Sequence, residues 1–418
     1  MRIVCVGGGP AGLYFSISAK LRDAGHEITV LEADPPEATY GWGVVYWHDL
    51  LDILHGNDPE SARAISAASV LWQQQEIRVH GDRHDGTAYF GGYGYSMGRA
   101  ALLGILTRRA RSLGVDVRHG ERLADPAGLP EADLVVAADG ANSRIRQSRA
   151  EHFGTRLETG RNPFVWLGTD RQFDRFVFAF EETEAGWIWF HAYPSFKGVS
   201  TCIVECSPET WQGLGLDTMD EEDAVPLLEK VFHRALDGHS LISRSRGAPA
   251  RWQRFTHVTN KTWVDGRVVL AGDAAHTTHF TLGSGTRLAM IDAIVLAHAL
   301  KRYDDPRVAL HEYDRHRRAE LHSVQAAART SMAWFEHLDG YLDRDPVDFA
   351  YAMAVRQGNQ PPWRYQTHLA TQLSPVRRVR RAYDTGRRWY RDRRWGEAPL
   401  PLLGRSARTP AASAPRHP

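Results

Sequence analysis

The sequence has few cysteines, almost no net charge and no long apolar run. Its 418 residues include three cysteines, Cys5, Cys202 and Cys206, and none belongs to a CxxC pair or a Cys/His cluster. We therefore expect no structural disulfide and no metal site. The formal net charge of +1 provides no global field that would steer the chain onto nucleic acid, so we predict no nucleic-acid partner.

The start of the chain lacks the marks of a signal peptide. A strand-like run, Ile3 to Val6, begins directly after the first two residues, and no basic region or cleavage site precedes it. No apolar segment approaches the roughly 18 to 20 residues needed to cross a bilayer. We therefore predict a soluble, cytoplasmic protein without a membrane span.

Residues 3–32 are typical of a βαβ unit. The strand IVCV leads into GGGPAG, a helical pattern and the strand EITVLE. Gly7, Gly9 and Gly12 form GxGxxG between strand and helix, and Glu32 ends the second strand. The glycines let the backbone approach a pyrophosphate, while Glu32 is placed to accept from a ribose hydroxyl. The unit predicts an α/β, Rossmann-like dinucleotide-binding domain, and the motif fits NAD and FAD equally well.

Later segments extend this pattern. LVVAADGANSRIR, residues 134–146, reads as a buried strand that ends at Asp139, and ligands of open α/β sheets bind at such ends. An amphipathic helix over 98–114 carries Arg99 in its first turn, within possible reach of a cofactor phosphate. RVVLAGDAAH, residues 267–276, resumes the nucleotide-type pattern before a helix from about Gly285 to Lys301.

Between these segments the sequence pattern changes from alternating strands and helices to successive strands. From Asn162 to Cys206, short aromatic and β-branched runs predict an antiparallel sheet. A period of two places Trp187, Trp189 and His191 on one face, where they either fill the sheet core or line an aromatic pocket. Beyond the helix at about 285–301 the chain is predicted to be helical to about Arg394, and its Pro-, Ala- and Ser-rich end is predicted to be disordered.

The combination of GGGPAG, Asp139-Gly140 and GDAAH at 272–276 resembles the class A FAD-dependent aromatic monooxygenases, which have the para-hydroxybenzoate hydroxylase fold. Further segments are similar to the branch with salicylyl-CoA 5-hydroxylase, anthraniloyl-CoA monooxygenase and the violacein-pathway tryptophan hydroxylase. These segments are GWGVV (41–45), GRNPFVWLGT (160–169), STCIVECSPETW (200–211), GDAAHTTHFTLGSGT (272–286) and ARTSMAWFE (328–336).

The resemblance implies a division of the chain and a set of cofactor contacts. The expected parts are a discontinuous FAD-binding domain (1–160 and 255–330), an inserted antiparallel β-sheet substrate domain (161–254), a C-terminal helical region (331–395) and a disordered tail (396–418). The glycine turn and Glu32 hold the adenosine half of FAD, Asp273 accepts from a ribityl hydroxyl, and residues 283–286 face the flavin pyrimidine. The expected cofactor-binding residues are Gly7, Gly9, Pro10, Ala11, Gly12, Glu32, Arg99, Asp139, Gly272, Asp273, Gly283, Gly285 and Thr286.

The resemblance also implies the chemistry. NADH or NADPH reduces FAD, O₂ forms a C4a-hydroperoxyflavin, and one oxygen atom passes to an electron-rich ring. The expected substrate is an aromatic acyl thioester on CoA or a carrier protein. A histidine near the ring substituent is suited to assist its ionisation at neutral pH. Among His48, His191, His276 and His279, we favour His279 and His191 as catalytic residues. Candidates for the substrate pocket are Trp42, His48, Trp166 and Trp189.

The segment 376–394 holds nine arginines against two aspartates. It is either a solvated helix face or a docking site for CoA phosphates or an acidic carrier protein.

Alternative functions share much of this pattern: hydroxylation of a free indole or phenol, flavin-dependent halogenation, reduction of the geranylgeranyl-reductase type, and nucleic-acid or membrane-surface binding by an inactive flavin fold. The halogenase WxWxIP motif would need Ile-Pro where this chain has His191-Ala192. Intact FAD motifs and the near-zero net charge disfavour the binding protein.

Overall fold

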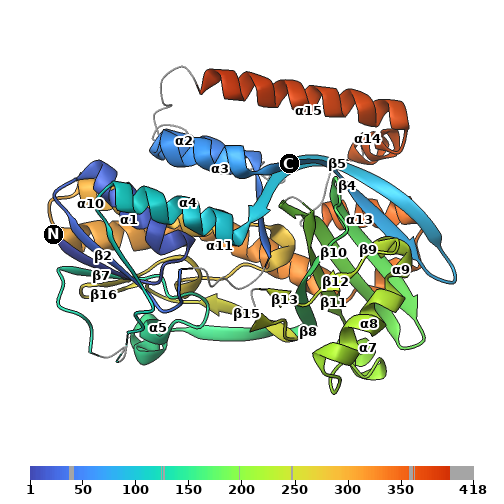
Figure 1. Cartoon of the computed structure of the whole chain (residues 1–418), viewed down its shortest axis with the longest axis horizontal. Helices are drawn as coiled ribbons and strands as arrows, with labels where there is room; N and C mark the ends of the chain where they lie inside the picture. The colour runs from blue at the N-terminus through green and yellow to red at the C-terminus, as the bar shows by residue number, and fades with distance from the viewer. Residues whose placement is uncertain are drawn as a thin grey trace, which may run out of the picture.

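Two β-sheets and the helices that cover them organise the chain (Figure 1). The computed structural model describes residues 1–36, 42–123, 125, 128–196, 198–245, 248–356, 361 and 363–395. The predicted disordered tail, 396–418, and Gly41 of the GWGVV segment lie outside the described residues.

The first sheet has six strands in the order β16-β17-β7-β1-β2-β6. They are β1 (Arg2–Val6), β2 (Glu27–Glu32), β6 (Asp116–His119), β7 (Leu134–Ala137), β16 (Val264–Asp265) and β17 (Val268–Leu270). From β17 to β6 the neighbours run parallel, and β16 is an antiparallel edge. The central strand β7 is buried along its whole length, as expected for a parallel sheet covered on both faces.

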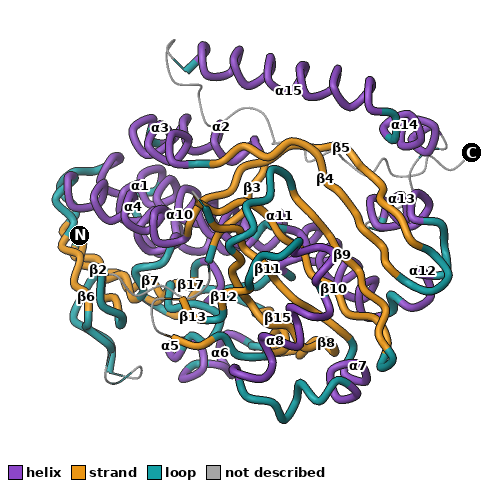
Figure 2. Tube along the Cα trace, turned by 45° about the vertical axis from the view of Figure 1, so that its right-hand side comes forward, coloured by secondary structure: helices purple, strands orange, loops and turns teal. Residues whose placement is uncertain are grey.

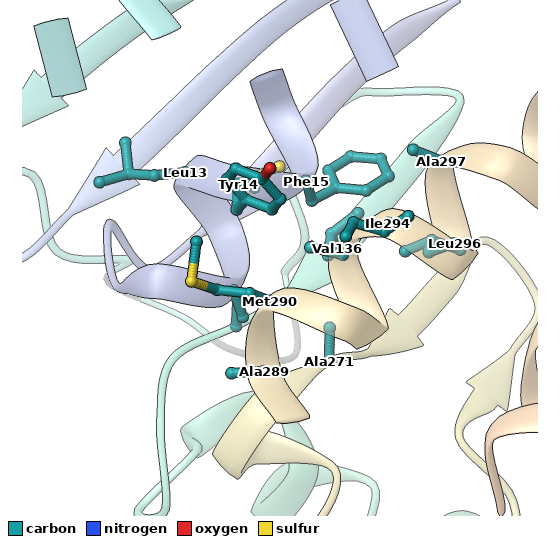
Figure 3. Packing of buried hydrophobic residues seen from close by; sticks show 14 of the residues in the cluster. Leu13, Tyr14, Phe15, Val136, Ala271, Ala289, Met290, Ile294, Leu296 and Ala297 are labelled. Carbon is teal, nitrogen blue, oxygen red and sulfur yellow. The ribbon is translucent and has the colours of Figure 1, made fainter. Parts of the chain in front are cut away.

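Helices α1 (Pro10–Arg22) and α10 (Gly285–Arg302) pack together beside this sheet (Figure 3). Tyr14 and Phe15 of α1 lie in one buried cluster with Met290 and Ile294 of α10. Gly272 lies where the helices cross, because a Cβ there would stand 2.8 Å from the Cβ of Ala11. The close crossing holds the start of α1 beside the segment that precedes α10.

The second sheet has nine strands in the order β12-β8-β11-β10-β9-β4-β5-β3, with β15 paired to β8. They are β3 (Gly43–Trp47), β4 (Val70–His80), β5 (Asp85–Gly98), β8 (Arg156–Thr169), β9 (Phe176–Thr183), β10 (Gly186–Phe196), β11 (Val199–Cys206), β12 (Leu241–Ile242) and β15 (Gln253–Thr259). A separate pair joins β13 (Arg244–Ser245) to β14 (Ala248–Pro249). The predicted antiparallel ladder runs from β8 through β11 and β10 to β9, and β4 joins β9 in parallel.

The second sheet extends beyond the segment 161–254 of the predicted substrate domain. Strands from 43–98 belong to it, and so do the first residues of β8 and the last of β15. The added strands are held by non-local packing, for example the ring of Trp72 on β4 against Phe176 on β9 at 5.4 Å. Such pairing leaves no mark in sequence spacing, which explains why the expected boundary and the sheet membership differ.

The remaining helices surround the two sheets (Figures 1 and 2). They are α2 (His48–Asn57), α3 (Pro59–Ala68), α4 (Arg99–Ser112), α5 (Arg144–Ser148), α6 (Ala150–Phe153), α7 (Pro208–Gly213), α8 (Glu221–Val231), α9 (His233–Leu236), α11 (Pro306–Glu336), α12 (Asp339–Leu342), α13 (Pro346–Val355), α14 (Trp363–Thr371) and α15 (Ser374–Arg394), with short 3₁₀ turns η1 (Gly272–Ala274) and η2 (Phe280–Leu282). Of the helices described, none combines the length and apolar character required to cross a bilayer.

Candidate active site

The glycine motifs, far apart in sequence, meet at one edge of the first sheet. Val6 pairs with Ala137, and Ala137 pairs with Leu270, so β1, β7 and β17 end side by side. Strand β2 ends next to them, because Val6 also pairs with Leu31. The GxGxxG turn, Glu32 and both later motifs therefore lie at the carboxyl edge, where ligands of such sheets bind.

The GxGxxG turn leaves no room for a side chain at two of its glycines. Gly7 has a φ of 110°, and a Cβ there would lie 2.2 Å from the carbonyl oxygen of Ala138. A Cβ on Gly12 would lie 2.1 Å from the carbonyl oxygen of Gly7. Gly9, which begins α1 without a side-chain cap, has no described atom within 4 Å of an added Cβ. The turn thus presents open backbone and a free helix start, with Pro10 and Ala11 in the first turn, an arrangement that suits a phosphate.

Glu32 connects the end of β2 to the glycine turn. Its Oε2 accepts the Gly8 N–H at 2.6 Å, and its Oε1 accepts the Asp34 N–H at 2.9 Å. Each carboxylate oxygen has a second lone pair. The carboxylate is therefore fixed in position with acceptor capacity left for a ribose hydroxyl, and that contact stays a prediction.

The opposite end of the site is formed by the segment from Gly272 to Thr286. Gly272 and Gly283 adopt φ values of 62° and 59°, and α10 begins at Gly285 without a side-chain cap. Asp273 is solvent-exposed although both its neighbours are buried. Desolvation by the surrounding protein raises the pKa of Asp273, and the nearby charges of His276 and Arg99 oppose this. The carboxylate is therefore accessible to a ligand although the protein around it disfavours its charge.

Asp139 follows β7, and one of its carboxylate oxygens accepts a hydrogen bond within the loop that leads to α5. Its Oδ2 accepts the N–H of Arg144 at 2.8 Å, at the start of α5. Its Oδ1 is buried and has no hydrogen-bond partner among the described residues. A buried acceptor without a partner is costly, which is consistent with a donor from a bound group at this position.

The two favoured histidines come from distant segments, and both contact the ring of Phe280. The ring of Phe280 lies 5.5 Å from that of His191 on β10 and 4.1 Å from that of His279. His191 also stacks on Phe176 at 5.9 Å, and its buried Nδ1 has no partner among the described residues. The structure thus brings both predicted residues to the face of the second sheet that carries Phe176, Phe178 and His191, which we call the aromatic face.

Both imidazoles are held neutral. Burial lowers the pKa of His191 to about 3, and the charge of Arg356 acts in the same direction. Burial also lowers the pKa of His279 to about 3, with contributions from His191, Arg356 and His257. The charged form of either ring is therefore strongly disfavoured at neutral pH.

The other predicted pocket residues lie in three different places. Trp42 lies flat on β8, where a Cβ on Gly168 would stand 2.8 Å from its ring, and Trp166 shares that face of β8. Trp189 is buried against Phe180 and Phe335, as expected for a residue of the sheet core. His48 stacks on Tyr93 at 5.0 Å. Burial lowers the pKa of His48, and the charges of two arginines of α15 act in the same direction.

His276, the fourth histidine considered, belongs to a buried ion network. Its Nε2 lies 2.8 Å from Oδ2 of Asp292, which also accepts the Gly272 N–H at 3.0 Å. The other oxygen of Asp292 pairs with Arg317 at 2.7 Å. This network holds the Gly272 segment in place, so His276 has a structural role here.

The sequence analysis missed three residues that form a hydrogen-bonded series ending at His279. Thr281, Ser331 and Arg356 are linked to it and to one another by hydrogen bonds of 2.8 to 2.9 Å. Ser331 lies in the ARTSMAWFE segment, whose similarity to known hydroxylases was a usable signal. Arg356 had no signal, since a single arginine near the end of a helix is unremarkable in sequence.

The residues of the first sheet fit FAD. Two uncapped helix starts, the carboxylates of Glu32 and Asp273, and the partnerless Oδ1 of Asp139 lie along the same sheet edge or directly after it. A long dinucleotide with phosphates in its middle matches this series of donors and acceptors.

Comparisons with known proteins agree with this geometry. The FAD binding domain family matches residues 1–328. A salicyloyl-CoA 5-hydroxylase from a Streptomyces species is 37% identical over 368 residues, covering 85% of this chain and 70% of the relative. The 3-hydroxy-4-methyl-anthranilyl-(aryl-carrier protein) 5-monooxygenase of Streptosporangium sibiricum is 37% identical over 381 residues, covering 90% of this chain and 100% of the relative.

Among solved structures, 2-methyl-3-hydroxypyridine-5-carboxylic acid oxygenase aligns with a TM-score of 0.62 at 22% identity, covering 86% of this chain and 93% of that one. That likeness is one of fold, and it confirms the predicted α/β class with a Rossmann-like domain. With its sheet-edge glycine motifs and the family match over most of its length, the chain belongs to the FAD binding domain family and is an FAD-dependent aromatic monooxygenase.

Proposed function

We propose that this chain hydroxylates the ring of an aromatic acyl group held as a thioester, with NADH or NADPH as reductant and O₂ as the oxygen source. One observation carries the thioester: two relatives at 37% identity are named for a salicyloyl-CoA and for an anthranilyl group on an aryl carrier protein. Bound FAD would supply the activation of O₂ that allows one of its oxygen atoms to enter the ring.

The residues of the sheet edge bind and orient this cofactor in our proposal. Gly7, Gly9 and Gly12 let the diphosphate approach the start of α1, while Glu32 binds the adenosine ribose and Arg99 balances phosphate charge. Asp273 accepts from the ribityl chain. The free N–H groups at the start of α10, near Gly285 and Thr286, place partial positive charge beside the flavin ring.

The aromatic face of the second sheet holds the substrate ring and excludes water. His191 and His279 remain neutral there, so each offers a hydrogen bond to a ring substituent without carrying a charge of its own. Phe280, which contacts both rings, provides an apolar wall together with Trp166 on β8 and Trp42, whose ring packs against β8. Exclusion of water protects the activated oxygen from side reactions.

The handle of the thioester docks on α15 in our proposal. Five arginines of this helix, Arg377, Arg380, Arg381, Arg388 and Arg391, lie against the second sheet. For example, Arg377 lies over the ring of Tyr89 at 4.0 Å, and Arg381 donates to the side chain of Gln74 at 2.6 Å. These contacts fasten the helix to the outside of the molecule (Figure 2).

The other face of α15 meets solvent. It carries the exposed arginines Arg378, Arg387, Arg393 and Arg394, and in the part of the chain that is described none of them forms an ion pair. Val379, Tyr383, Trp389 and Tyr390 on this helix are 60 to 70% exposed. Unpaired positive charge mixed with exposed aromatic rings suits an acidic, partly apolar protein surface better than isolated phosphates, which favours a carrier protein over free CoA.

Substrate screening tests this function. The purified chain should be yellow, and its NADH or NADPH oxidation should accelerate with salicyl or anthranilyl thioesters on CoA or a carrier protein, with a product one oxygen heavier. Equal stimulation by the free acids, by indole or by phenol would instead support hydroxylation of a free aromatic. Absence of flavin would contradict the proposal.

A set of arginine variants tests the docking surface. Replacing Arg378, Arg387, Arg393 and Arg394 together by Ser should raise KM for the carrier-bound thioester about fivefold or more at low salt. KM for the N-acetylcysteamine thioester should stay within about twofold. The matched control replaces four exposed arginines of other elements, Arg108, Arg122, Arg156 and Arg307. Equal effects of both sets, or on both substrates, would overturn the docking role of α15.

A further inference from the structure

A chain of hydrogen bonds runs from α13 to His279. Arg356, which directly follows α13, places its Nε 2.8 Å from Ser331 Oγ on α11. Ser331 Oγ lies 2.9 Å from Thr281 Oγ1, and Thr281 Oγ1 lies 2.9 Å from His279 Nδ1. The four residues come from three separate elements, so this series of hydrogen bonds exists only in the folded molecule.

The guanidinium of Arg356 determines which atom donates and which accepts in each hydrogen bond of the series. A guanidinium group only donates, so Ser331 Oγ accepts from Arg356. The single proton of Ser331 then has one acceptor among its described partners, Thr281 Oγ1. Ser331 is fully buried, and a buried hydroxyl without an acceptor costs about 1 to 3 kcal/mol. The proton of Thr281 is consequently left for Nδ1 of His279.

Arg356 itself is anchored for this task. Its two terminal nitrogens donate to the carbonyl oxygens of Met353 at 2.6 Å and Thr281 at 3.0 Å, and its guanidinium lies over the ring of Phe335. Within the described structure no carboxylate pairs with it, and burial lowers the pKa of Arg356 to about 10. The group is still a cation at neutral pH, and its uncompensated charge polarises the hydroxyls that it binds.

We propose that Arg356, Ser331 and Thr281 are positioning residues that lock His279 in its neutral Nε2–H tautomer, so that His279 presents a hydrogen-bond donor to an oxyanion on the substrate ring. A donor aimed at a phenolate favours the ionised phenol, which is the electron-rich form that accepts oxygen. His279 thus assists ionisation by stabilising the product of proton loss, and it does not take the proton. The choice of a ring oxyanion rests on the proposed function, whereas the tautomer does not.

Nitrogen NMR of the histidine rings tests the tautomer in the FAD-loaded full chain. With ¹⁵N-labelled histidine, and His279 assigned by its loss in His279→Gln, the wild-type spectrum should show protonated Nε2 and bare Nδ1 at neutral pH. Ser331→Ala and Thr281→Val should each lose this pattern. Thr281→Ser, which keeps the hydroxyl, should retain it. The matched control is Thr330→Ala on the same helix, whose hydroxyl bonds to Ala326, and it should leave the pattern unchanged.

Two results would overturn the proposal: a protonated Nδ1 in the wild type, or an unchanged tautomer in both Ser331→Ala and Thr281→Val. The wild-type spectrum depends on His279→Gln alone, for its assignment, so a failure of Ser331→Ala or Thr281→Val to fold does not remove the test. Because the spectrum is recorded without substrate, it separates this inference from the proposed function. A chain with the Nε2–H tautomer that hydroxylates no thioester would contradict only the latter.

Discussion

At the cofactor edge of the first sheet the chain offers mainly backbone, whereas at the aromatic face of the second sheet it offers side chains. Gly7, Gly9 and Gly12 and the starts of α1 and α10 present N–H groups, with two partly accessible carboxylates beside them. The aromatic face presents buried, neutral imidazoles around Phe280.

In the proposed function, the first region binds the cofactor and the second binds the reacting ring. A phosphate-rich cofactor needs donors at short range, and only glycine lets the backbone come close enough. A reacting ring needs a dry enclosure in which a few polar groups keep a fixed protonation state. The cofactor region is therefore sensitive to added volume, and the aromatic face to changes in charge.

The largest expected effect comes from the side-chain network under the cofactor region. Asp292→Asn should lower the free energy of unfolding by about 3 to 5 kcal/mol, because it removes the buried counter-ion of Arg317 and leaves only Glu320, whose side chain is 63% exposed. Urea unfolding measures this. The control is Asp343→Asn, whose pair with Arg83 is more than 70% exposed and should contribute no more than about 1 kcal/mol. Similar losses in both variants would show that the network does not support the site.

A second prediction separates the glycines of the turn. Gly12→Ala should cost about 3 kcal/mol of stability, because its Cβ meets the carbonyl oxygen of Gly7 at 2.1 Å. Gly9→Ala should change the stability of the FAD-free chain by less than about 1 kcal/mol, yet weaken FAD binding about tenfold or more. Thermal unfolding and flavin fluorescence titration measure the two quantities. Equal FAD affinity in Gly9→Ala and wild type would contradict the assigned phosphate site.

The third prediction concerns a buried acid on the aromatic face. Burial raises the pKa of Glu205 from 4.5 to about 7, although the hydrogen bond from Asn162 at 2.9 Å opposes it. The folded state therefore binds a proton that the unfolded state has lost, and this stability is present below about pH 4.5 and lost as pH rises through 7. Glu205→Gln should become more stable relative to wild type by about 2 kcal/mol between pH 5 and pH 8. A constant difference across this range would refute the shift.

The smallest expected effect is an absence of titration. With the pKa values of His191 and His279 lowered to about 3 by burial, neither ring changes charge between pH 6 and pH 8. Single-turnover hydroxylation should therefore vary less than about twofold from these groups over that range. A wild-type inflection near pH 6.5 that disappears in His279→Gln would show instead that this imidazole titrates.

Prediction of the fold from sequence succeeded where the fold depends on short segments. The strand, glycine turn and helix start around GxGxxG can be recognised within a few residues, because a tight turn or a helix start needs a particular residue at a particular place, while the cofactor contacts of Glu32 and Asp273 stay predictions. The same holds for the strands from Phe164 to Cys206. The pairing of β4 with β9 was not predictable, since contacts across about a hundred residues have no local signal.

The aromatic face shows the limit most clearly. His191 and His279 were chosen for their neighbours in sequence, and the structure places both against Phe280. Whether each ring is neutral depends on burial and on the charge of Arg356, which lies 77 positions beyond His279 in the numbering. Likewise, five of the nine arginines of α15 anchor the helix, and only the fold separates these from the four exposed ones.

The sequence by itself determined that this chain is an α/β flavoprotein of the monooxygenase family, because backbone geometry at glycine turns is a local property. Tertiary structure alone decided that Arg356, Ser331 and Thr281 converge on His279. Protonation states and hydrogen-bond direction follow from desolvation and from partners brought together by packing. Those quantities belong to the folded interior and have no counterpart in the order of residues.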